Sequence, residues 1–199
     1  MLTARGSRAG YRGPEAAVIL AVDPGLATCG YAVVYPRTGG VVELGTLTTK
    51  PTAGVHESTD RTRRLRTQVA QLDAIARRNG CTTIAAEAMS FGGPGRFAMA
   101  ISLCLSWGGL VGLAHALDAE LLEVPPKTWQ HALLGTDGTG RVDYEHVFAA
   151  LSSFVGKQGD ALAAIPEGQR NHALDAVGVG LFAAFRPTTA IRTATEVRA

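Results

Sequence analysis

Hydrophobic runs in the first quarter of the chain predict three β-strands. Residues 17–22 form a continuous apolar run, which is typical of a strand buried on both faces. The run stops at Asp23-Pro24-Gly25, a turn signal, and further apolar segments follow at 30–35 and 41–47. Because the connections between the three segments are short, we expect them to form an antiparallel meander.

The pattern changes to a helical period after residue 57. An apolar stripe formed by Leu65, Val69, Leu72 and Ile75 or Ala76 predicts a helix over 58–79. A strand at 82–87, a long apolar helix at 97–117 and a strand at 120–124 follow, and then helices at 127–134, 142–155 and 170–185. This order predicts an α/β fold. Its mixed five-stranded sheet has three antiparallel strands and then two parallel ones, flanked by helices.

Composition limits the organisation of the chain and its surroundings. The 199 residues, of which 46% are hydrophobic, are enough for one domain, which we expect at 16–186 between a flexible basic arm at 1–15 and a flexible tail at 187–199. Three cysteines without CxxC spacing argue against a disulfide framework or a zinc site and favour a reducing, cytoplasmic location. Ser, Gly and His interrupt the apolar segment at 97–117, so we expect no membrane span.

Three acidic residues border buried segments where packing alone does not favour a charge. Asp23 ends the first predicted strand, Glu87 ends the fourth, and Asp175 lies in an apolar part of the last helix. If the first and fourth strands are parallel neighbours, Asp23 and Glu87 meet at the edge where open α/β sheets place their sites. Carboxylates gathered there suit Mg²⁺ or Mn²⁺, although Asp23 in a turn and Asp175 as a local cap are the structural alternatives.

His172 lies three residues before Asp175, so both side chains face one side of the predicted helix. A single helical histidine is more often structural. Next to an acidic metal site it could instead bind the metal, contact the scissile phosphate or carry a proton.

The residues around these acids resemble the RuvC family of Holliday-junction resolvases, which belong to the ribonuclease-H-like superfamily. The opening strand and turn, Ile19 to Leu26 with Gly30-Tyr31 after them, resemble the most specific signature of that family. Weaker matches follow in the same order along the chain, at 84–87, 123–129, 139–143 and 171–176. The resemblance covers about 17–185 and fits a divergent or phage-type member as well as a housekeeping bacterial enzyme.

The resemblance implies a ribonuclease-H-like fold, a homodimer and metal-dependent nicking of two strands at a four-way DNA junction. Asp23, Glu87, Asp175 and His172 would be the catalytic and metal-binding residues, holding two Mg²⁺ or Mn²⁺ ions, and the protein would be nucleoid-associated, with branch-migration proteins as further candidate partners. Two such ions activate a water on one side of a phosphodiester and stabilise the leaving 3′-oxygen on the other.

Basic and aromatic residues supply candidate contacts to DNA. Residues 61–78 carry six Arg and one Asp, a local charge of +5, although a solvated helix face is an equal alternative. Phe91 and Phe97 flank a Gly-rich loop after Glu87, from which an aromatic side chain could enter an opened junction. The candidate DNA-binding residues are Phe91, Arg96, Lys127, Arg141, Arg61 and Arg64.

Other functions remain compatible with the same acidic residues. The main alternatives are another nuclease of this fold (YqgF-like, or cleaving RNA–DNA hybrids) and a non-catalytic module that binds branched DNA. An actin-like or sugar-kinase ATPase needs a second phosphate-binding domain, for which this chain is too short. The long helix at 97–117, which is rich in small residues, is the candidate dimer interface.

Overall fold

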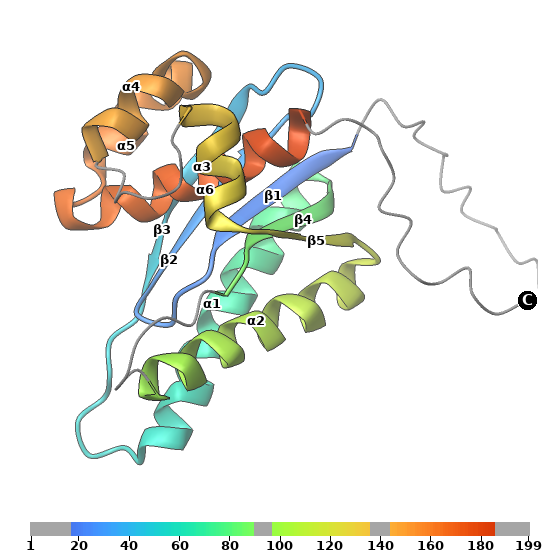
Figure 1. Cartoon of the computed structure of the whole chain (residues 1–199). Coiled ribbons are helices and arrows are strands. Elements are labelled where there is room, and N and C mark those ends of the chain that lie inside the picture. The colour runs from blue at the N-terminus through green and yellow to red at the C-terminus, as the bar shows by residue number, and fades with distance from the viewer. Residues whose placement is uncertain (1–16, 90–96, 136–143, 186–199) are drawn as a thin grey trace, which may run out of the picture.

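The computed structural model describes residues 17–89, 97–135 and 144–185, and these form a sheet with helices on both faces (Figure 1). The expectations for the arm at 1–15 and the tail at 187–199 lie outside the described residues. The strands are β1 (Val18–Asp23), β2 (Thr28–Val34), β3 (Val41–Thr48), β4 (Cys81–Glu87) and β5 (Glu120–Val124). The fold is the predicted α/β type with a mixed five-stranded sheet.

The sheet has the strand order β3-β2-β1-β4-β5. Strands β1, β2 and β3 form an antiparallel meander, in which Asp23 pairs with Gly30. Strand β4 then pairs parallel to β1, with Val22 opposite Ala86, and β5 pairs parallel to β4. The carboxyl ends of β1 and β4 are therefore neighbours, which is the condition under which Asp23 and Glu87 were expected to meet.

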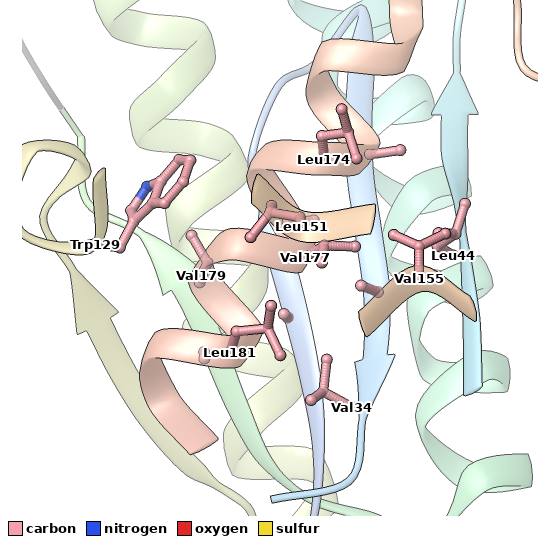
Figure 2. Packing of buried hydrophobic residues seen from close by; sticks show 14 of the residues in the cluster. Val34, Leu44, Trp129, Leu151, Val155, Leu174, Val177, Val179 and Leu181 are labelled. Atoms are coloured by element: carbon pink, nitrogen blue, oxygen red, sulfur yellow. The ribbon is translucent and has the colours of Figure 1, made fainter. Parts of the chain in front are cut away.

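The central strand β1 is buried along its whole length because both of its faces are covered. Ile19 and Ala21 face a core formed with helix α6 (Glu167–Phe185) and the short helices that pack on it, shown in Figure 2. Val18, Leu20 and Val22 face a second core against α1 (Glu57–Asn79) and α2 (Phe97–Leu117). The period of two along a strand distributes these residues between the two cores.

Smaller helices complete the layer around α6. They are α3 (Pro126–Leu134), α4 (Tyr144–Val155), a 3₁₀ turn at Gly156–Gln158 and α5 (Gly159–Ala164). The sequence pattern did not predict the turn or α5, because six residues are too few to show a helical period. Helix α6 also begins three residues earlier than expected, directly after Pro166.

Helix α2 is apolar on all sides and only partly covered. It packs on α1 and the sheet, whereas Leu105 and Val111 are 37% and 48% exposed. The segment Ala100–Leu117 has a mean hydropathy of 1.6, so by length and composition alone it is apolar enough to cross a membrane, a weak criterion that core helices also meet. The Ser, Gly and His residues within this segment do not lower its mean hydropathy enough to exclude it.

Candidate active site

The structure places Asp23 and Glu87 at the same edge of the sheet. Asp23 is the last residue of β1 and is 8% exposed, and Glu87 is the half-buried last residue of the neighbouring parallel strand β4. Backbone pairing of the two strands fixes this proximity, because parallel neighbours end on one side of the sheet.

Helix α6 brings His172 and Asp175 to this edge. The helix crosses β2 very closely at Gly30, where a Cβ atom would lie 1.9 Å from the carbonyl oxygen of His172. Because Gly30 is the register partner of Asp23, the contact places the first turns of α6 beside the end of β1. Nδ1 of His172 donates a hydrogen bond of 2.6 Å to Oδ2 of Asp23.

The charges at this edge repel one another in poorly solvated surroundings. Burial first, and then the charges of Asp23 and Glu87, raise the pKa of Asp175 to about 8. Burial and the charge of Asp23 likewise raise the pKa of Glu87 to about 7. The hydrogen bond to Asp23 raises the pKa of His172. The site therefore holds more acid groups than it can keep ionised at neutral pH without added positive charge.

Trp129 supports Glu87 from the other side. Trp129 belongs to α3, and its side chain is fully buried. Its Nε1 donates a 2.9 Å hydrogen bond to Oε1 of Glu87. This hydrogen bond favours the ionised carboxylate and so lowers the pKa of Glu87. The sequence pattern gave no role to this tryptophan beyond its place in the RuvC-like segment 123–129. A buried indole N–H needs a hydrogen-bond acceptor, and from the sequence this requirement was the only indication that Trp129 contacts a polar group.

The donor set at this edge fits a hard divalent cation. Three carboxylates and one imidazole match the ligands of Mg²⁺ or Mn²⁺, and the raised acid pKa values mean that such a cation would replace protons. Within the described ranges, no three His, Cys, Asp or Glu side chains stand in an arrangement that could hold a metal ion. Binding would therefore have to draw these side chains closer together.

The candidate DNA contacts are distributed unevenly. Lys127 is exposed near the start of α3, and Arg61 forms an ion pair with Glu57 on α1. Phe91, Arg96 and Arg141 lie outside the described residues. An open hollow of about 550 Å³ along α1 is lined by hydroxyl groups and two arginines, namely Ser58, Thr59, Thr62, Arg63, Arg66 and Thr67.

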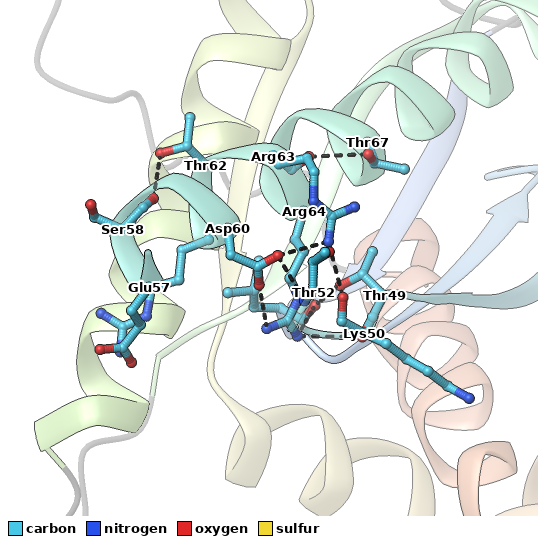
Figure 3. A network of polar contacts seen from close by, with 12 residues as sticks. Thr49, Lys50, Thr52, Glu57, Ser58, Asp60, Thr62, Arg63, Arg64 and Thr67 are labelled. Atoms are coloured by element: carbon cyan, nitrogen blue, oxygen red, sulfur yellow. Dashed lines mark hydrogen bonds and ion pairs between the residues drawn. The ribbon is translucent and has the colours of Figure 1, made fainter. Parts of the chain in front are cut away.

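Arg64 differs from its neighbours and does not fit the expected role. It is only 8% exposed, and its guanidinium donates to the Leu26 carbonyl and to Thr49 (Figure 3). A side chain used in this way inside the protein is not free to contact phosphate. The buried face of α1 begins with Asp60, Arg64 and Gln68, whereas the sequence pattern placed Leu65 and Val69 there.

Comparison with solved structures shows the same architecture in junction resolvases. The structure of Thermus thermophilus RuvC in complex with a Holliday junction substrate matches with a TM-score of 0.67 at 20% identity, over 85% of this chain and 93% of that one. The chain has the ribonuclease-H-like fold of RuvC. A second T. thermophilus RuvC structure gives a TM-score of 0.62 at 18% identity, covering 83% of this chain and 95% of that one.

The likeness extends to a eukaryotic resolvase at lower identity. Ydc2, the yeast mitochondrial Holliday junction resolvase, gives a TM-score of 0.57 at 10% identity, with 83% of this chain and 77% of Ydc2 covered. No protein-family model matches the sequence, and no curated protein matches it. The resemblance to RuvC-type resolvases that the motifs carried is therefore confirmed at the level of structure.

Proposed function

We propose that this protein is a metal-dependent endonuclease that resolves four-way DNA junctions as a homodimer. The observation that carries the proposal is the set of acids at one sheet edge, where burial and like charge raise the pKa values of Glu87 and Asp175 to about 7 and 8. Carboxylates whose pKa values are shifted by burial and like charge cluster at functional sites. The fold shared with RuvC and Ydc2 supports a nuclease on this scaffold.

Each residue has a role that follows from its place. Asp23, Glu87 and Asp175 would hold Mg²⁺ or Mn²⁺, with Asp23 central because it interacts with the other two and with His172. When bound, such cations supply the positive charge that makes an attacking water acidic and stabilises a leaving 3′-oxygen. His172 is hydrogen-bonded to Asp23 and 42% exposed at its side chain, and it would hold or donate a proton near the scissile phosphate.

The incompletely covered face of α2 supports the proposed dimer. Leu105 and Val111 are exposed on a helix without charged residues. Between α1 and α2 an open groove of about 430 Å³ is lined in part by Gly109, Gly112 and Ala116. If two copies of the chain met at this face around a twofold axis, their two active sites would be related by that axis. A symmetric four-way junction relates the two strands to be cut by a twofold axis as well.

The deciding experiment compares cleavage of a synthetic four-way junction, the matching duplex and an RNA–DNA hybrid, with Mg²⁺ and with EDTA. We expect Mg²⁺-dependent, paired nicks in the junction alone. Asp23→Asn should abolish cutting and keep junction binding, because it removes a charge and preserves the shape. Cutting of the hybrid would favour another nuclease of this fold, and binding without cutting by the wild type would favour a non-catalytic module.

A further inference from the structure

The four-residue turn between β1 and β2, Pro24–Ala27, is held by an unusual set of buried polar side chains. Nε2 of Gln68 donates to the carbonyl oxygens of Gly25 and Leu26 at 2.9 and 3.2 Å, and also to that of Leu47 at 3.3 Å. Gln68 is 3% exposed, so these contacts are removed from water. The turn follows directly after Asp23, the central acid of the candidate site.

Arg64 precedes Gln68 by four residues on α1, and its guanidinium group also contacts the segment Pro24–Ala27. Its Nη2 donates to the Leu26 carbonyl at 3.2 Å and to the Thr49 carbonyl at 3.3 Å, while Nε donates to Oγ1 of Thr49 at 2.9 Å. Thr49 in turn donates to the Leu26 carbonyl at 2.5 Å, and its backbone N–H donates to Ala27. Three side chains thus donate to the single carbonyl of Leu26.

Asp60 supplies the carboxylate that pairs with the arginines of this cluster. Its carboxylate accepts hydrogen bonds from Arg63 at 2.8 Å and from the backbone N–H of Thr52 at 3.1 Å, and Nη1 of Arg64 lies 3.8 Å from Oδ2 (Figure 3). The hydrogen bond from Arg63 holds the pKa of Asp60 below its usual range, so the acid remains ionised at neutral pH. Helix α1 therefore presents to the turn a fixed cluster of one carboxylate and two arginines.

The turn has little freedom to adjust. A Cβ atom on Gly25 would lie 2.3 Å from the carbonyl oxygen of Thr28, so the backbone folds back on itself closely at this point. The space between the turn and helices α1 and α2 is about 10 Å³, about the room of one water molecule. A single water molecule cannot replace the several contacts that Gln68 and Arg64 make with this turn and its neighbours.

We infer that Gln68 and Arg64 are positioning residues, which fix the turn after Asp23 and thereby set where its carboxylate meets a divalent cation. This inference rests on the proposed function, because it assigns Asp23 to the metal. Side chains that orient a ligand from behind typically change metal affinity or activity by about 10- to 100-fold when they are replaced. Neither residue touches the metal or the DNA, so both act through Asp23.

The test replaces Gln68 and uses Gln158 as its matched control. Gln158 also donates to a strand carbonyl, that of Val42 at 2.7 Å, but on β3 and away from the acids. Gln68→Met and Gln158→Met each roughly keep the side-chain volume and remove a donor to a strand carbonyl, a buried donor at Gln68 and a part-buried one at Gln158, so both should lower the melting temperature. Mn²⁺ binding to the DNA-free protein, followed by calorimetry and electron paramagnetic resonance, should weaken about tenfold in Gln68→Met alone.

Cleavage kinetics supply the second readout. We expect kcat on a four-way junction to fall about tenfold in Gln68→Met with KM unchanged, and both constants to stay at the wild-type value in Gln158→Met. Arg64→Lys, which keeps the charge beside Asp60 but loses the forked geometry, should reproduce the loss of Mn²⁺ affinity if Gln68→Met does not fold. Arg77→Lys on the exposed face of α1 is its control.

The outcomes separate the two proposals. Equal Mn²⁺ affinity and kcat in the Gln68 and Gln158 variants, in a wild type that cuts junctions, would overturn the positioning role and leave the proposed function standing. A wild type that binds Mn²⁺ but cuts no junction would refute the proposed function, while a selective loss of affinity in Gln68→Met would still support positioning. A wild type that binds no Mn²⁺ would overturn both.

Discussion

Replacing Asp175 by asparagine should stabilise the metal-free protein while destroying its chemistry. Burial and the charges of Asp23 and Glu87 raise the pKa of Asp175 from 3.8 to about 8. The folded state therefore binds this proton more tightly than the unfolded chain does. The destabilisation is absent below about pH 4, grows as the pH rises, and is complete near pH 8.

The expected size follows from the same pKa difference. At about 1.4 kcal/mol for each pH unit, the difference between 3.8 and about 8 sets an upper bound of roughly 6 kcal/mol. Asp175 is only half-buried, and water screens part of the repulsion, so we expect Asp175→Asn to gain about 2 kcal/mol in the free energy of unfolding at pH 8.

Urea unfolding in EDTA at several pH values between 4 and 8 measures this gain. The advantage of the variant should shrink towards pH 4, where the aspartate is protonated in the folded state and protonation of the unfolded chain, with its pKa of 3.8, has become substantial. Saturating Mg²⁺ should stabilise the wild type selectively, by about 3 kcal/mol at a hundred times its dissociation constant, and close the gap. An asparagine variant that is less stable than the wild type at pH 8, or a gain that does not depend on pH, would refute the reasoning.

Three further predictions concern neighbouring features of the molecule. Trp129→Phe removes the hydrogen bond that lowers the pKa of Glu87, so the rising limb of a pH–rate profile for Mg²⁺-dependent cleavage should move to higher pH; an unmoved limb would exclude Glu87 as the titrating group. Gly30→Ala should cost about 3 kcal/mol or prevent folding, measured by thermal unfolding, because a Cβ atom would lie 1.9 Å from the His172 carbonyl oxygen; wild-type stability would contradict the close packing of α6 on β2. Arg66→Glu on the exposed face of α1 should weaken junction binding in a titration at several salt concentrations and lower the salt dependence by about one counterion, and an unchanged slope would assign that face to solvent.

Much of the fold follows from local sequence patterns. The five strands and the two long helices on one face of the sheet lie within about two residues of the positions that hydrophobic runs and the turn signal at Asp23-Pro24-Gly25 predict. These patterns are readable because burial on one or two faces of an element imposes a period on its sequence. The short helix α5, only six residues long, has no such period and was not predicted.

The candidate site could be predicted only in part. Asp23, Glu87 and Asp175 stand out because a charge at the end of a buried strand or in an apolar helix needs an explanation, and the motifs resemble RuvC around them. Their electrostatic coupling, and the hydrogen bond from His172 to Asp23, depend on where α6 crosses the sheet. No local pattern encodes that crossing.

The sequence alone determined which residues are apolar, which elements they form and which acids lie at the ends of those elements, because these are properties of neighbouring positions. Only the tertiary structure decided that Arg64 and Gln68 turn inward to the turn after Asp23, and that Trp129 donates to Glu87. Whether a polar side chain on a helix faces water or a buried carbonyl depends on what lies opposite it. Here the buried carbonyls belong to the turn between β1 and β2, which lies 38 to 43 residues away in sequence from Arg64 and Gln68.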